Sequence, residues 1–174
     1  MANSEQLGIE FLREARREMA DCRRKIEHCV EQLSEEQLWW RPNEATNSIA
    51  NLLLHLAGNI GQRIGSGVGG QPYDRDRDRE FAERGPIGKV ELRARLDRSI
   101  ALADRVLAGL ADEQLLEARR YRMLRGDVEA SVLRLIVQTL VHLGGHTQEI
   151  IAMTRRQLGD AYRFMQPPAI PAAH

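Results

Sequence analysis

The sequence predicts an all-α protein that folds as a single four-helix bundle with two long loops. Four long stretches repeat apolar residues every three or four positions, which is the period of a helix that buries one face. The segments between these stretches are rich in Gly, Pro, Asn and Asp, which favour turns and loops. No stretch alternates apolar and polar residues convincingly over the length of a strand, so we expect no sheet.

We predict the first helix from about Ser4 to Leu33, because its apolar residues recur in steps of four or three throughout. This stripe consists of Leu7, Phe11, Ala15, Met19, Cys22, Ile26, Cys29 and Leu33. Its two cysteines are about 10.5 Å apart along a helix, at ~1.5 Å per residue, so we interpret them as buried apolar residues that cannot bridge each other. Residues 34–37, Ser-Glu-Glu-Gln, form a capping box before a short turn with Trp39 and Trp40, which we interpret as packing residues.

The second helix is expected to begin at residues 46–48, where three good N-cap residues lie together, and to continue to about Ile64. Its apolar stripe is Ile49, Leu53, Leu56, Ile60 and Ile64. The glycines that follow are expected to end it: Gly65, Gly67, Gly69 and Gly70.

The third helix is predicted over roughly residues 88–110, and the fourth over about residues 128–158. Between them, residues 111–127 form the second loop, with a possible helical turn at 113–117. The fourth helix is apolar nearly all round between Val132 and Leu143, so we predict that it is the most enclosed helix. The bundle domain is therefore expected over residues 1–165, with a loose Pro-rich tail at 166–174.

Alternating charges mark the first long loop, in the run Asp74-Arg-Asp-Arg-Asp-Arg-Glu80. Because the two signs neutralise each other, we interpret this run as a solvated, self-paired loop. The alternative is that it forms a lid near a functional site or a dimer contact.

Three histidines in helical stretches predict a site for a divalent metal ion. His142 and His146 are four residues apart, so their side chains leave the same face of the fourth helix. His55, on the second helix, is able to supply a third imidazole, which leaves a coordination position open for water or a substrate. The common alternative is that such a pair binds no metal, because both histidines lie on the helix surface or one is hydrogen-bonded inside the core. His28 lies off the apolar stripe and His174 ends the chain, so both are expected in solvent.

Polar residues beside these histidines predict the groups that orient them. Asn51 and Asn59 lie four residues on either side of His55, and Glu149 lies three residues after His146. A metal-binding imidazole needs a hydrogen-bond partner on its second nitrogen, and we expect these three residues to serve the site in that way. Glycines on the same two helices, including Gly58, Gly144 and Gly145, would permit close approach of the backbones.

Charge and hydropathy exclude several other classes of partner. Lys plus Arg number 25 and Asp plus Glu number 25, so the net charge is zero and nothing attracts nucleic acid or an anionic membrane. No uncharged apolar run reaches the ~18 residues of a membrane span, and no N-terminal run is typical of a signal peptide. We therefore expect a cytoplasmic protein.

The histidine motifs resemble those of the DinB/YfiT-like metal-dependent four-helix proteins. The resemblance covers roughly residues 7–158 and rests on residues 48–55 (Ser-Ile-Ala-Asn-Leu-Leu-Leu-His) and 142–150 (His-Leu-Gly-Gly-His-Thr-Gln-Glu-Ile). Residues 67–81 resemble a branch of that superfamily with undefined activity. The resemblance implies an up-down-down-up bundle, Zn²⁺ or Ni²⁺ on His55, His142 and His146, and a homodimer. It also implies relatives that are transferases using a low-molecular-weight thiol such as bacillithiol or mycothiol.

The leading functional hypothesis is a metal-dependent thiol S-transferase that acts on small electrophiles, with Glu149 as a possible proton carrier. A cation on three neutral imidazoles keeps its charge and lowers the pKa of a bound thiol or water. The alternatives are a metal-dependent hydrolase and a non-catalytic stress-response or ligand-binding bundle. The sequence does not identify the metal, because imidazole nitrogen suits several transition metals.

Overall fold

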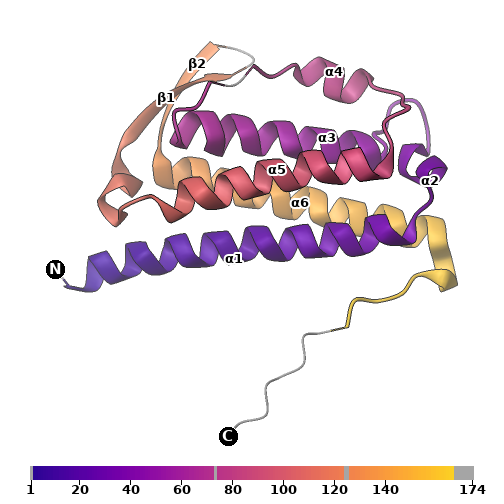
Figure 1. The fold of residues 1–174 in the computed structure, drawn as a ribbon, viewed down its shortest axis with the longest axis horizontal. Helices are drawn as coiled ribbons and strands as arrows, with labels where there is room; N and C mark the ends of the chain where they lie inside the picture. The colour runs from indigo at the N-terminus through magenta and orange to yellow at the C-terminus, as the bar shows by residue number, and fades with distance from the viewer. Residues whose placement is uncertain (1, 73, 124–125, 167–174) are drawn as a thin grey trace, which may run out of the picture.

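Four long helices lie side by side in the computed structural model, which describes residues 2–72, 74–123 and 126–166 (Figure 1). They are α1 (Ala2–Gln32), α3 (Ile49–Ile60), α5 (Lys89–Ala108) and α6 (Val132–Leu158). This arrangement confirms the predicted all-α bundle. The tail prediction at 166–174, apart from Gln166, and the prediction for His174 fall outside the described residues.

The direction of the helices explains the long connection between α3 and α5. Helices α1 and α6 run one way along the bundle, and α3 and α5 run the other way (Figure 1). Because α3 and α5 are parallel, the chain between them must travel back along the whole bundle. It does so over the outer side of α3, and it forms the short helix α4 (Arg77–Ala82) on the way. We call residues 69–88 the strap.

Short helices and side-chain caps close the ends of the bundle. Helix α2 (Glu35–Trp39) begins with the predicted capping box of Ser34 and Gln37. The indole Nε1 of Trp39 donates to the carbonyl of Ile87 at 3.2 Å, and this contact joins α2 to the end of the strap. Trp40 is 39% exposed, so only one of the two tryptophans packs as predicted. A short 3-10 helix, η3 (Gly159–Ala161), follows α6.

The second helix ends at Gly69, one of the predicted glycines, and not near Ile64 as expected. Helix α3 continues without a break into a π-helix, η1 (Gly61–Val68). The glycines in this segment permit close packing: a Cβ on Gly65 would lie 2.8 Å from Leu102, and one on Gly67 would lie 3.3 Å from both Leu135 and Tyr121. They therefore let neighbouring side chains approach the helix and do not interrupt it.

A β-hairpin occupies most of the second predicted loop, contrary to our expectation of no sheet. After the 3-10 helix η2 (Asp112–Leu116), where a helical turn was expected, β1 (Ala118–Met123) pairs antiparallel with β2 (Gly126–Ser131). Among the strand residues whose side chains are described, only Tyr121 and Ala130 are buried, so the apolar alternation is too weak to recognise in the sequence. Consequently α6 begins at Val132, with Ser131 as its N-cap, four residues later than predicted.

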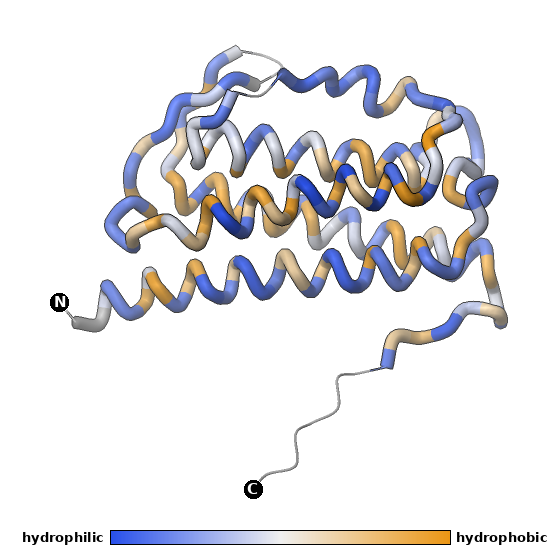
Figure 2. Tube along the Cα trace, viewed as in Figure 1, coloured by the Kyte–Doolittle hydropathy of each residue, from blue (hydrophilic) through white to orange (hydrophobic). Residues whose placement is uncertain are grey.

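Helix α3, and not the fourth helix, is the most enclosed element. All twelve of its residues are buried, since the strap covers the side that the other helices leave open. On α6, by contrast, Val137 is 42% exposed and Val141 is 72% exposed. Apolar residues recur along the bundle helices, whereas α4 and the hairpin are largely hydrophilic (Figure 2). Among the described residues, no helix is long and apolar enough to cross a membrane.

Candidate metal centre

The three predicted histidines converge between α3 and α6. One nitrogen each of His55, His142 and His146 lies within 4.8 Å of the other two. The Nε2 atoms of His55 and His142 are 2.9 Å apart. Nitrogens that share an ion at ~2.0–2.1 Å stand about 3 Å apart, so the spacing of His55 and His142 already suits a shared divalent transition metal.

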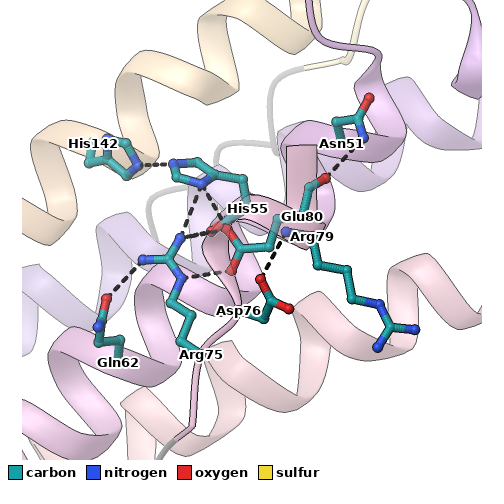
Figure 3. A network of polar contacts seen from close by, with 8 residues as sticks. All are labelled: Asn51, His55, Gln62, Arg75, Asp76, Arg79, Glu80 and His142. Atoms are coloured by element: carbon teal, nitrogen blue, oxygen red, sulfur yellow. Dashed lines mark hydrogen bonds and ion pairs between the residues drawn. The ribbon is translucent and has the colours of Figure 1, made fainter. Parts of the chain in front are cut away.

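The strap fixes the orientation of His55 (Figure 3). Its Nδ1 lies 3.0 Å from Oε2 of Glu80 and 3.1 Å from Nη2 of Arg75. Both hydrogens of that Nη2 have other acceptors, namely Glu80 Oε2 at 2.7 Å and the His55 carbonyl at 3.3 Å. Nδ1 therefore carries the proton and donates it to Glu80, which leaves the Nε2 lone pair directed at the other histidines.

Arg75 and Glu80 form a buried ion pair, so the interpretation of residues 74–80 as a solvated loop is wrong for these two side chains. Nε of Arg75 donates to Oε1 of Glu80 at 2.6 Å, and the side chains are only 6% and 11% exposed. Nη1 of Arg75 also donates to Gln62 at 2.9 Å. Gly58 makes space for the pair, because a Cβ there would overlap Oε1 of Glu80. The remaining charged residues of the run are exposed, as expected.

The two asparagines do not contact the imidazole, which corrects their predicted role. Asn51 completes the capping box of Ser48, and its Nδ2 donates to the carbonyls of Glu80 and Glu83 at 2.9 and 3.0 Å. It therefore holds the strap on α3 and acts on His55 only through Glu80. Asn59 is buried, and its Oδ1 has no hydrogen-bond partner among the described residues.

Glu149 contacts a site histidine in the predicted way. Its Oε2 lies 2.7 Å from Nδ1 of His146, which leaves Nε2 of that ring free for a metal. The side chain of His146 is 23% exposed, against 5% for His55, so the centre is more open at His146. The ring of Phe81, on α4, covers the other side, with its centroid 4.6 Å from that of His55.

Two other predicted features differ in the structure. A Cβ on Gly144 or on Gly145 would meet nothing within 4 Å, so neither residue serves a close helix contact. His28, expected in solvent, is half-buried, and its Nε2 lies 2.6 Å from the carbonyl of Arg163. The cysteines Cys22 and Cys29 are buried and unpaired, as interpreted.

The imidazoles of His142 and His55 are held in the neutral form that metal binding requires. Burial is the largest cause that lowers the pKa of His142 to about 3, and electrostatic repulsion from His146 and His55 adds to it. Burial also lowers the pKa of His55, although its hydrogen bond to Glu80 opposes the effect. These two histidines therefore present nitrogen lone pairs at neutral pH without first losing protons.

These pKa shifts predict that the metal-free protein loses stability in mild acid. Between the unfolded pKa of 6.5 and the folded pKa of about 3, the unfolded His142 binds a proton and the native one does not. The free energy of unfolding should therefore fall as the pH is lowered from 7 to 5. Urea unfolding of the chelator-treated protein at both pH values measures this, and His142→Asn should reduce the difference. An equal loss of stability in the variant would contradict the assignment.

A hollow of about 660 Å³ lies between α3, α4 and α5, next to the centre. Gly58 and Glu80 line it, but the three histidines do not. It therefore borders the carboxylate that orients His55 and gives no access to the imidazole nitrogens.

Comparisons with known proteins find a matching family and a solved structure with a similar fold. The family described as "Protein of unknown function (DUF1572)" matches residues 6–170. A search of curated proteins gives no match. A solved structure, the conserved protein of a locus from Enterococcus faecalis, is similar with a TM-score of 0.67 at 14% identity, over 84% of this chain and 96% of that one. This similarity concerns the fold alone.

Proposed function

This chain belongs to the DUF1572 family, and we propose that it is a metal-dependent enzyme of the DinB/YfiT-like group that transfers a small thiol to an electrophile. The observation that carries the proposal is the convergence of three imidazole nitrogens within 4.8 Å, two of them on rings that a carboxylate orients. Rings oriented in this way are typical of a metal centre, because the carboxylate sets the tautomer and makes the ligand more basic.

Zn²⁺ or Ni²⁺ is the ion that we propose for His55, His142 and His146. When bound, such an ion supplies positive charge that lowers the pKa of an adjacent thiol or water toward neutrality. Three neutral protein ligands also leave a coordination position for the substrate, which distinguishes this site from a closed structural one. The partial exposure of His146 supports entry from that side.

In the proposed reaction, the thiol gives up its proton and its sulfur forms a bond to an electrophilic carbon. The carbon's bond to the leaving group breaks, and the leaving group takes the electron pair; an epoxide oxygen would instead accept a proton. Glu149 is 46% exposed beside His146 and is suitably placed to pass the released proton to solvent. Glu80 and Phe81 keep His55 oriented and shielded from water. We include a homodimer in the proposal, and the exposed Val137 and Val141 offer apolar surface for it.

Elemental analysis and a two-substrate assay test the proposal together. We expect about one metal per chain, and turnover of electrophiles such as epoxides and activated aryl halides only when a thiol is supplied. His28→Ala is the matched control, because His28 lies outside the centre and should retain metal and turnover. Hydrolysis that needs no thiol would identify a metal hydrolase instead. If the metal-loaded protein converted no electrophile with or without a thiol, and substitutions of the three histidines changed only the melting temperature, the protein would be a non-catalytic bundle.

A further inference from the structure

Arg63 is a half-buried cation without a partner in the described part of the chain. Its side chain makes no ion pair or hydrogen bond there, and its Nε is buried without an acceptor. Burial lowers the pKa of this guanidinium. Leaving a charged donor unpaired away from water is costly, so such a group is uncommon unless a ligand completes it.

The position of Arg63 relates it to the metal centre. It lies on η1, eight residues after His55 on the same continuous helical segment. The preceding residue, Gln62, accepts a hydrogen bond from Arg75, which itself contacts His55 Nδ1. The charge of Arg63 also contributes to the low pKa of His142.

The other charged side chains at the centre already have partners. Arg75 is paired with Glu80, and Glu149 is hydrogen-bonded to His146. The one buried side-chain acceptor without a partner among the described residues, Oδ1 of Asn59, belongs to a neutral amide and cannot compensate a cation. A bound divalent ion would add further positive charge. The centre with its metal is therefore electropositive and attracts an anion.

We infer that Arg63 binds a carboxylate on the small molecule that occupies the candidate metal centre. The planar fork of a guanidinium matches a carboxylate in two parallel hydrogen bonds. One carboxylate also supplies the single negative charge that pairs with one guanidinium. This inference rests on the proposed function, and it restricts the substrates to molecules that carry a carboxylate in addition to the group that binds the metal.

A series of three thiols of similar length tests the inference by binding and not by activity. The Co²⁺-loaded protein is titrated with 3-mercaptopropionate, its neutral amide and the cationic cysteamine, and the sulfur-to-cobalt absorbance reports binding. A charge-assisted bidentate contact is expected to favour the carboxylate over the amide by about tenfold or more, with cysteamine weakest. Arg63→Gln should remove this preference at unchanged cobalt content, and Arg63→Lys should retain part of it.

Arg134→Gln is the matched control, because Arg134 is an exposed arginine on α6 whose side chain has no partner at the centre. It should keep the wild-type order of affinities. Equal binding of the three thiols by the wild type would overturn the inference and leave the proposed function standing; this comparison does not depend on any variant folding. A preference that survives in Arg63→Gln would also overturn it. A wild-type protein that takes up no cobalt would overturn both the inference and the proposed function.

Discussion

His142→Ala should leave the bundle folded and remove its bound metal. His142 supplies one of three nitrogens, and its Nε2 stands 2.9 Å from that of His55. Without it, two imidazoles remain, and the loss of affinity should exceed the roughly 10–100-fold that removal of a ligand's orienting partner costs. Metal content by elemental analysis, and Zn²⁺ titration against a competing chelator, measure the effect.

The same measurements on His28→Ala provide the comparison. That variant also loses a half-buried histidine, but one whose contact is a carbonyl outside the centre. It should bind metal as the wild type does. If His142→Ala retained one metal per chain, the three-histidine site would be wrong, and His55→Ala offers an independent repetition of the test from the other helix.

Glu80→Gln should weaken metal binding by about 10–100-fold and also destabilise the protein. The amide is a poorer acceptor for Nδ1–H of His55, and it leaves the charge of Arg75 unpaired in a site where that side chain is 6% exposed. Removing one partner of a buried pair costs about 1–3 kcal/mol or more in the free energy of unfolding. Metal titration and urea unfolding measure the two effects separately.

A double variant separates the role of Glu80 in stability from its role at the metal. Arg75→Gln combined with Glu80→Gln removes both charges, so part of the stability should return while the metal affinity stays low. Gly58→Ala should weaken metal binding as well, because its Cβ would displace the carboxylate. Asp78→Asn, an exposed change in the same run, should alter neither property. Wild-type metal affinity in Glu80→Gln would show that the carboxylate does not orient His55.

The sequence was sufficient to predict the bundle because each predicted long helix has an apolar face that is buried and a second face that is more polar. It was insufficient for the hairpin, where Tyr121 and Ala130 alone are buried among the strand side chains described and arginines occupy half of β1. Gly65 was misinterpreted for a related reason, whereas Gly69 caps the helical segment as predicted. Glycine is typical of both a helix end and a close contact, and only the neighbour Leu102 shows which applies at Gly65.

The candidate site was predictable where its residues are close in the chain. The spacing of His142 and His146 places both on one face, and Glu149 lies within the next turn. Glu80 was not identified, because its contact with His55 depends on the path of the strap over α3. An alternating run of charges usually lies in water, and nothing local in residues 74–80 indicates that one arginine and one glutamate are buried.

The strap has a consequence for how the protein would respond to its ion. Because Glu80 reaches His55 from a segment that crosses the outside of the bundle, the ordering of that segment and the occupation of the centre are reciprocal. If the ordered strap increases the metal affinity by a given free energy, the bound metal stabilises the ordered strap by the same free energy. Loss of the ion would therefore first reduce the order of the strap on the outer surface over α3, while the helices beneath it keep their packing.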